Sequence, residues 1–143
     1  MTAPPAPRKH DWQFDHLSLQ AAPGDTGIDR LAALLGLQPG RRPAFPFGGR
    51  WFYQGAAPVL HVIDAPGEED AAFDHIAFRS HHPLESVLPA IVSCGLPYCV
   101  KRIPETATAQ IFIQVAERFV LELDVPEGTA SAVVTDYSSS HVE

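Results

Sequence analysis

The chain has 143 residues, 45% hydrophobic and 19% charged, a composition that suits one compact globular domain. Seventeen acidic residues against ten basic ones give a net charge of -7, the wrong sign for a protein that binds nucleic-acid phosphates. No apolar run approaches the roughly 18 residues that span a bilayer, and prolines occupy the N-terminus where a secretion signal needs an apolar segment, so we expect a cytoplasmic protein that binds neither nucleic acid nor membrane.

The ends of the chain differ in composition from its middle. Residues 1–12 contain three prolines and are expected to form a flexible leader, and residues 127–143 are polar and turn-rich and are expected to form a tail. Residues 13–126 are therefore the predicted folded domain. Its two cysteines, Cys94 and Cys99, are too few for a disulfide framework and are expected to be reduced.

The two halves of this domain begin with similar segments. Residues 14–19 read Phe-Asp-His-Leu-Ser-Leu, and residues 73–78 read Phe-Asp-His-Ile-Ala-Phe, at an offset of 59. Both are short and largely apolar, which favours β-strands. The unchanged Phe-Asp-His tripeptide indicates an internal duplication.

A helix is predicted after each of these strands. Apolar residues recur at the i, i+3, i+4 spacing that lines one buried helix face: Ile28, Leu31, Ala32 and Leu35 in the first half, and Leu84, Val87, Leu88, Ile91 and Val92 in the second. Gly36 and Gly95, again 59 apart, are expected to end the two helices in a left-handed conformation. Because Pro89 would interrupt a helix interior, the second helix is expected to begin near Glu85 or Ser86, with Pro89 in its first turn.

Further strands complete each half of the predicted repeat. They are residues 50–54 and 59–63 in the first half and residues 110–114 and 119–123 in the second, with weaker patterns near residues 44–47 and 97–102. Superposing the last strands puts His61 on Glu122, at an offset of 61. The predicted fold class is α+β, with two tandem βαβββ modules at residues 13–66 and 73–126.

Four side chains that can bind metal occupy equivalent positions of the repeat. His16 and His75 lie on the first strands, and His61 and Glu122 lie on the last strands. A carboxylate buried unpaired in an apolar strand costs on the order of several kcal/mol, so Glu122 should face solvent or meet a cation. Three histidines and a carboxylate suit one divalent transition-metal ion (iron, nickel, cobalt, manganese or zinc) better than calcium or magnesium. Any one of these histidines alone is as well explained by a hydrogen-bonded core or surface position, but their joint placement favours a site formed by all four residues.

Other polar residues are weaker candidates. Asp15 and Asp74 precede two of the histidines and are expected to face solvent or anchor turns, with the orientation of a histidine ring as the alternative. The remaining histidines, His10, His81, His82 and His141, are expected to be solvated. Arg41, Arg42 and Arg50 flank the aromatic loop at residues 45–49 and would meet an anionic or planar substrate, although surface solubility explains them equally well. Gln110, Tyr98 and Arg102 are further candidates to face the site.

Over residues 13–126 the chain resembles the vicinal oxygen chelate superfamily, which includes glyoxalases, bleomycin-resistance proteins and extradiol dioxygenases. The resemblance rests on residues 14–19, 58–63, 73–78 and 120–123. It implies a cup-shaped mixed sheet with helices outside, a metal ion held at His16, His61, His75 and Glu122, and a homodimer whose site is built from one chain or two. The chain departs from glyoxalase-like members at His61, where they carry glutamate, and before Glu122, where residues 115–118 differ from the usual turn.

Three functions are weighed, with Glu122 and His61 as the predicted catalytic residues. The first is a glyoxalase-like lyase or isomerase, in which the metal polarises the vicinal oxygens of a small substrate and Glu122 or a bound water moves a proton. The second is an extradiol ring-cleaving dioxygenase that uses Fe(II) on His16, His75 and Glu122, with His61 off the metal as an acid or base. The third is a non-catalytic drug-binding protein, which the full ligand set disfavours. Four ligands leave two adjacent positions for a bidentate substrate, so the sequence favours the first.

Overall fold

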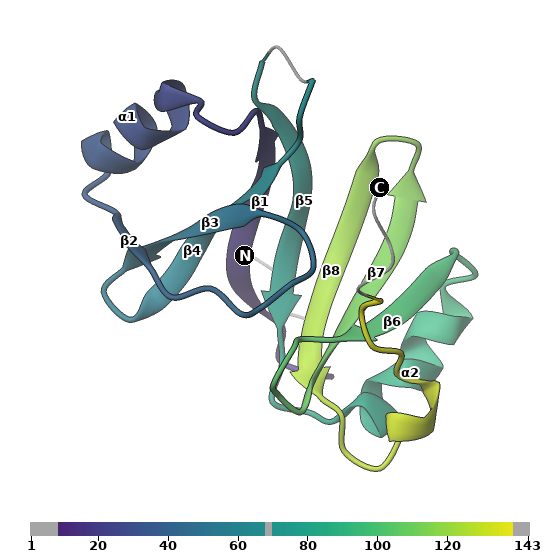
Figure 1. Ribbon diagram of the computed structural model, residues 1–143. Helices are drawn as coiled ribbons and strands as arrows, with labels where there is room; N and C mark the ends of the chain where they lie inside the picture. The colour runs from purple at the N-terminus through teal and green to yellow at the C-terminus, as the bar shows by residue number, and fades with distance from the viewer. Residues whose placement is uncertain (1–8, 68–69, 139–143) are drawn as a thin grey trace, which may run out of the picture.

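The structure, a computed structural model, describes residues 9–67 and 70–138, in which the order βαβββ occurs twice. The first module consists of β1 (Gln13–Ala21), α1 (Thr26–Leu34), β2 (Gln38–Gly40), β3 (Gly49–Gln54) and β4 (Ala57–Asp64). The second consists of β5 (Ala72–Arg79), α2 (Leu84–Ser93), β6 (Tyr98–Arg102), β7 (Thr108–Ala116) and β8 (Phe119–Pro126). The modules lie side by side, each with its own helix (Figure 1).

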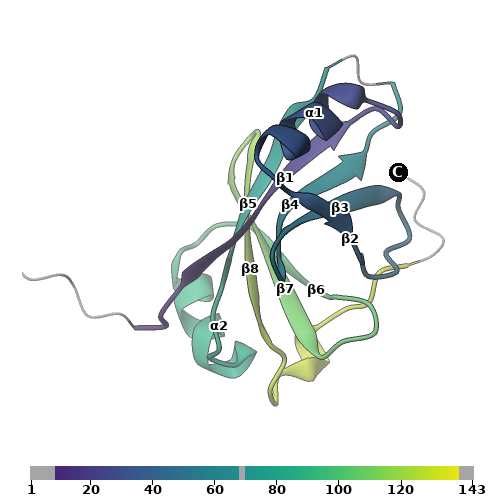
Figure 2. The same cartoon turned by 90° about the vertical axis from the view of Figure 1, so that its left-hand side faces the viewer.

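The strands form one open mixed sheet in the order β2-β3-β4-β1-β5-β8-β7-β6. β1 and β5 pair antiparallel at its centre, and each pairs in parallel on its other side with the last strand of its own module, β4 or β8. The strand order from the centre outward is thus the same in both halves, as a duplication requires. The predicted class, α+β with two tandem βαβββ modules in a mixed sheet, is confirmed. The edge strands β2 and β6 do not pair with each other, so the sheet stays open (Figure 2).

Local sequence signals set the limits of the helices. Asp25 caps α1, because its side chain accepts a hydrogen bond of 2.7 Å from the Gly27 N–H. Both helices are followed by a glycine with positive φ, 71° at Gly36 and 73° at Gly95, as the repeat predicts.

Two sequence expectations about the elements are wrong. α2 begins at Leu84, after Pro83, so Pro89 lies beyond the first turn. Pro89 is exposed, so water can satisfy the carbonyl that loses its helical partner. No strand forms at residues 44–47: β2 lies earlier, at Gln38–Gly40, and Pro46 has no N–H to donate to a sheet.

Each module buries its own apolar core between its helix and the sheet. The first core contains Ala21, Ile28, Ala32, Leu37, Phe52, Leu60 and Val62, and the second contains Leu84, Val87, Ile91, Val100, Ala109, Ile111, Ile113, Leu123, Val125 and Val134. Side chains alternate along a strand, so Leu17 and Leu19 pack against the first core while His16 and Ser18 project to the opposite face of β1. The cores therefore leave the concave face of the central strands to polar side chains.

Segments outside the two modules also have defined positions. Trp12 packs against the second core, and the Ser80 hydroxyl donates to the His10 carbonyl. A short 3-10 helix, Ser131–Val133, follows β8, and Thr135 forms a parallel bridge with Lys101 of β6. His141 lies outside the described residues. Neither helix in the described part of the chain is long and apolar enough to cross a membrane.

Candidate metal centre

Three of the four predicted ligands meet over the central strands. His16 comes from β1, His75 from β5 and Glu122 from β8, which are consecutive in the sheet. His16 and Glu122 lie on either side of Ala77, which pairs with both. His75 pairs with Ser18, the equivalent of Ala77 in the repeat. Small side chains at both repeat positions leave room above the strands for the three polar groups.

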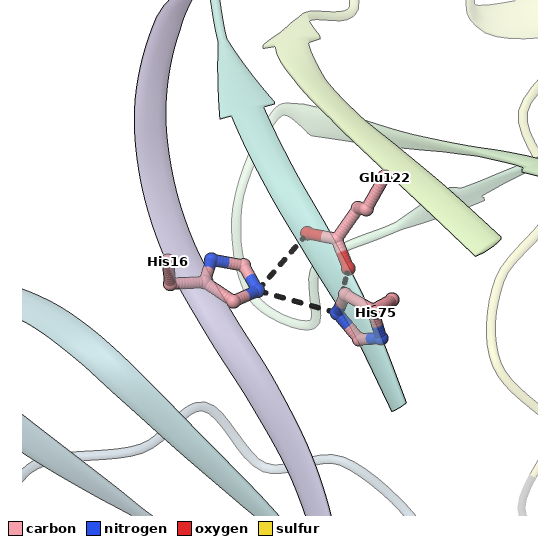
Figure 3. Close-up of side chains that lie close together, drawn as sticks. All are labelled: His16, His75 and Glu122. Atoms are coloured by element: carbon pink, nitrogen blue, oxygen red, sulfur yellow. Dashed lines mark hydrogen bonds and ion pairs between the residues drawn. The ribbon is translucent and has the colours of Figure 1, made fainter. Parts of the chain in front are cut away.

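The three side chains point at one another (Figure 3). His16 Nε2 lies 3.3 Å from His75 Nε2 and 3.6 Å from a Glu122 oxygen, and His75 Nε2 lies 2.9 Å from the other Glu122 oxygen. Ligand atoms about 2.1 Å from an ion are about 3.0 Å apart at adjacent octahedral positions and about 3.4 Å apart at tetrahedral ones. The observed separations bracket these values. Two imidazoles and a carboxylate with this spacing therefore fit a divalent transition metal, which His16, His75 and Glu122 would hold.

Each histidine of this triad is held by the aspartate before it. The Nδ1 atoms of His16 and His75 lie 2.6 Å and 2.5 Å from carboxylate oxygens of Asp15 and Asp74. A histidine that donates through Nδ1 offers the lone pair of Nε2 to a metal, and both Nε2 atoms face the centre. The structure therefore favours the histidine-orienting alternative for both aspartates over a purely solvent-facing position.

Two β-bulges make this contact between adjacent residues possible. Consecutive side chains in a regular strand point to opposite faces. The pairing of β1 with β5 skips Asp15, between Phe14 and His16, and skips Asp74, between Phe73 and His75. A bulge redirects a side chain locally, so each aspartate can reach the ring of the histidine that follows it.

Without a metal ion, the charges of the triad balance one another. Burial opposes a charge on His75, but its hydrogen bonds to Asp74 and Glu122 outweigh burial and raise the pKa of His75 to about 9. Burial likewise favours a neutral Glu122, but the hydrogen bond from His75 and the proximity of His16 lower the pKa of Glu122 below its usual range. A proton on His75 Nε2 thus occupies the position that a metal ion would take.

The fourth predicted ligand, His61, has a different environment. Its ring is stacked between His16, at a centroid distance of 3.5 Å, and Trp51, at 3.9 Å. His61 Nε2 donates to the Pro58 carbonyl at 3.0 Å. Burial, with His16 nearby, lowers the pKa of His61 to about 2, so the ring is neutral and Nδ1 is its acceptor nitrogen. Potential ligand atoms within 4.8 Å of one another form two groups in the described part of the chain, one of His16, His75 and Glu122 and one of Asp15, His16 and Asp124, and neither contains His61.

Two further buried polar groups lie near the centre. Ser18 Oγ has no hydrogen-bond partner in the described part of the chain and lines the adjoining cavity, so it is available to a ligand or water. Burial and the neighbouring Glu122 carboxylate raise the pKa of Asp124 well above its usual range. Neither residue was singled out in the sequence.

A cavity of about 400 Å³ opens beside the triad, between the two modules. Its lining combines aromatic side chains with polar and charged ones: Phe45, Phe47, Trp51, Phe112 and Tyr137 among the former, and Ser18, Arg42, His61, His75, Lys101, Gln110 and Glu122 among the latter. A second cavity of about 370 Å³ is more polar and shares Trp51, His61, Gln110 and Glu122 with the first. The triad can therefore be reached from two sides.

Of the weaker candidates from the sequence, some line the cavity and others lie away from it. Arg42 lines the cavity, with its guanidinium carbon 5.1 Å from the ring centres of both Phe45 and Phe47. Gln110 also faces the cavity and is 6% exposed. Arg50 instead pairs with Asp29 on the surface, and Arg102 pairs with Glu127 at 2.7 Å. Tyr98 is exposed, and the Arg41 carbonyl accepts a hydrogen bond from the Tyr53 hydroxyl. His81 and His82 lie in the turn before α2, with ring centres 4.5 Å apart and ring planes inclined by 34°.

Sequence reasoning missed two important residues of the cavity. Trp51 lies in a segment correctly predicted as a strand, but its contact with His61 depends on pairing across β3 and β4. Tyr137 lies in the expected tail, and a lone aromatic residue among serines was the available signal.

Two βαβββ modules sharing one open mixed sheet define the fold of the vicinal oxygen chelate superfamily. Solved structures with this fold include the 2,3-dioxygenase LapB from Pseudomonas sp. KL28, with a TM-score of 0.62 and 18% identity over 81% of this chain and 43% of that one. The E323L mutant of homoprotocatechuate 2,3-dioxygenase from Brevibacterium fuscum has a TM-score of 0.62 and 14% identity over 86% of this chain and 34% of that one. Methylmalonyl-CoA epimerase from Mycobacterium tuberculosis has a TM-score of 0.57 and 16% identity over 83% of this chain and 91% of that one.

These identities establish the shared fold alone. The chain spans less than half the length of either dioxygenase but most of the length of the epimerase. No family model matches the sequence, and no curated protein matches it. The activity must therefore be argued from the site.

Proposed function

We propose that the chain is a metal-dependent enzyme of the extradiol type, which opens the ring of a catechol with dioxygen and uses Fe(II) held by His16, His75 and Glu122. One observation carries the proposal: three ligand atoms converge, from two histidines and one carboxylate, while the fourth predicted ligand is stacked to the side. Two histidines and one carboxylate on a face are the donor set of non-haem Fe(II) oxygenases.

The lyase or isomerase favoured by the sequence depended on four ligands. With His61 donating through Nε2 to Pro58, three ligands leave three positions, enough for both oxygens of a catechol and for dioxygen. The support therefore moves to the dioxygenase, which was the second hypothesis and which required His61 to stay off the metal.

The cavity suits a flat aromatic substrate. Phe45, Phe47 and Phe112 line it, and Trp51 covers the outer face of His61. Such walls bind an aromatic ring by apolar contact and exclude water from the reacting atoms. Two titratable groups of the chain then face the substrate: neutral His61 can accept a hydrogen bond from a substrate hydroxyl at Nδ1, and Glu122 remains a carboxylate.

The proposed reaction consumes one catechol and one dioxygen. The carbon–carbon bond between a hydroxyl-bearing ring carbon and its unsubstituted neighbour breaks, both oxygen atoms enter the product, and the catechol is oxidised while dioxygen is reduced. Bound Fe(II) would supply the redox path between the two substrates and lower the pKa of a coordinated hydroxyl. The residues of this chain supply the binding, the orientation and a hydrogen-bond acceptor for a substrate hydroxyl.

A second candidate is an isomerase that moves a proton next to a chelated carbonyl. The observation that favours it is coverage, because the match spans 91% of the length of the epimerase but only 43% and 34% of the two dioxygenases. A non-catalytic binder has less support, since the triad and the aspartates that orient it serve no purpose in a purely apolar binding site. Homodimerisation and a cytoplasmic location stay predictions.

Anaerobic reconstitution with Fe(II), followed by a panel of catechols in air, tests the proposal. We expect dioxygen uptake matched by a ring-opened, coloured product, and loss of both with Zn(II) in place of Fe(II) or with Glu122→Gln. Metal-bound protein that turns over no catechol, but exchanges a substrate proton with deuterated water, would establish the isomerase instead. Protein that binds no divalent ion overturns both.

A further inference from the structure

The C-terminal strap, defined here as residues 134–137, is fastened along the edge of the second module. The Thr135 N–H donates to the Val100 carbonyl at 3.1 Å, and the Arg102 N–H donates to the Thr135 carbonyl at 3.0 Å. Val134 is 9% exposed and belongs to the second core, and Arg102 also forms an ion pair with Asp136. The strap is thus held on β6 by backbone pairing, an apolar anchor and charge.

From this anchored position Tyr137 reaches across the cavity to the first module. Its ring meets Phe45 edge to face at a centroid distance of 5.3 Å and contacts Phe47 at 5.9 Å. Both phenylalanines belong to the loop between β2 and β3. Tyr137 therefore joins the two modules over the cavity beside the triad.

One side chain, Gln110, connects the hydroxyl of Tyr137 to Glu122 of the metal centre. Tyr137 OH donates to Gln110 Oε1 at 2.6 Å, and Gln110 Nε2 lies 3.5 Å from Glu122 Oε2. Because the phenol takes the amide oxygen, the amide NH₂ is directed to Glu122. The other oxygen, Glu122 Oε1, is the one 2.9 Å from His75. The two carboxylate oxygens thus have different partners.

We propose that Tyr137 is a positioning residue of the metal centre, which orients Glu122 through Gln110 so that the site is complete only when the C-terminal strap is docked. The inference rests on the metal centre of the proposed function. A hydrogen bond to one carboxylate oxygen restricts the carboxylate to a single orientation, and such outer partners tune metal affinity. The phenol is half-buried, and desolvation raises its pKa above the usual range, so it remains a donor.

If Tyr137 had a purely structural role, the contacts of its ring would account for its whole contribution. Tyr137→Phe keeps the ring contacts with Phe45 and Phe47 and removes only the hydroxyl. Tyr98→Phe is the matched control, because Tyr98 lies at the start of β6, the strand to which the strap is bonded, is 41% exposed and does not line the cavity beside the triad. Any effect of the Tyr137 hydroxyl on Glu122 must pass through the side-chain amide of Gln110, and Gln110→Leu removes that amide.

The experiment titrates Co(II) into the metal-free full-length chain and its variants, and records both affinity and the visible ligand-field spectrum. We expect Tyr137→Phe to weaken Co(II) binding by about threefold to tenfold and to shift the spectrum, below the roughly 10- to 100-fold typical of direct partners of a ligand. The double variant with Gln110→Leu should be no weaker than Gln110→Leu alone, because both changes break one pathway. Tyr98→Phe should match wild type.

Each outcome decides the matter. If Tyr137→Phe has the affinity and spectrum of the control, the inference is overturned and the metal centre stays intact. The same holds if the effects of Tyr137→Phe and Gln110→Leu on Co(II) affinity add. Wild-type protein that binds no Co(II) overturns the metal centre and the inference together. Thermal unfolding of the metal-free variants checks folding, and if Tyr137→Phe does not fold, an unchanged spectrum in Gln110→Leu overturns the inference.

Discussion

His61 lies face to face on His16, with ring centres 3.5 Å apart and ring planes inclined by 15°. Trp51 stacks on the other face of His61 at a centroid distance of 3.9 Å and an angle of 14°. The residue at the repeat position of Glu122 therefore packs against a member of the triad. A hydrogen bond from Nε2 to Pro58 holds it there.

From this stacking we expect His61→Ala to lower the affinity for Zn(II) by less than about tenfold, below the loss of roughly 10- to 100-fold that follows removal of a hydrogen-bond partner of a ligand. His75→Ala removes a converging nitrogen and should lower it more than about 100-fold. Competition with a chromogenic chelator measures both. Equal losses in the two variants would make His61 a ligand and restore the four-ligand argument for a lyase.

Metal binding should release a proton from His75. The pKa of His75 is raised to about 9 in the absence of metal, so Nε2 is protonated at pH 7.5 and must lose that proton to bind an ion. Because the proton on His75 Nε2 competes with the ion, the apparent metal affinity falls as the pH drops below about 9, by about tenfold per pH unit. Calorimetry in buffers of different ionisation enthalpy counts the proton, and a pH-independent affinity between pH 6 and 8 contradicts the prediction.

The fold was predictable because its signals are local and occur twice. The Phe-Asp-His tripeptide and the helix-ending glycines Gly36 and Gly95 keep one offset, and period-3.6 apolar patterns lie between them. His16 and His75 follow from that repeat, since equivalent residues of two antiparallel central strands come together. Glu122 follows from the cost of burying a charge among apolar neighbours.

The remaining features of the site depend on packing that a strand pattern does not encode. His61 and Glu122 occupy equivalent backbone positions, but the His61 ring stacks between His16 and Trp51 and is not one of the three converging groups. Alternation along a regular strand puts Asp15 and His16 on opposite faces, so the bulges that join them were invisible. Tyr137 reaches the cavity only because the C-terminal strap pairs with β6.

The end of α2 gives a prediction about stability. Gly95 has a φ of 73°, and a Cβ there would meet no atom within 4 Å, so any cost of substitution comes from the backbone conformation. Gly95→Ala should lower the free energy of unfolding by about 1 to 2 kcal/mol, and Gly95→Asn by less, because asparagine tolerates the left-handed region. Urea unfolding measures both. Alanine no worse than asparagine would contradict the assignment of Gly95 as the helix-ending residue.

The bulged aspartates should control which nitrogen of each histidine is free. Asp74 accepts from His75 Nδ1 at 2.5 Å and also from Gln20 Nε2 at 2.5 Å, so its carboxylate is fixed on both sides. In Asp74→Asn the amide oxygen can still accept from Nδ1, but without a charge to raise the basicity of the ring, so Zn(II) affinity should fall by about 10- to 100-fold. In Asp74→Ala the Zn(II) affinity should fall further, because the His75 ring loses its orientation as well.

Asp15→Asn should repeat this loss at His16, whose Nδ1 lies 2.6 Å from Asp15, while the exposed Asp70→Asn serves as the matched control. Nitrogen-detected NMR of the metal-free imidazoles reports the tautomer directly, without a metal or a substrate. We expect the Nδ1–H form at His16 in wild type and a mixture with the Nε2–H form in Asp15→Ala. If the aspartate variants keep wild-type tautomers and wild-type Zn(II) affinity, the two bulges shape the sheet but do not orient the ligands.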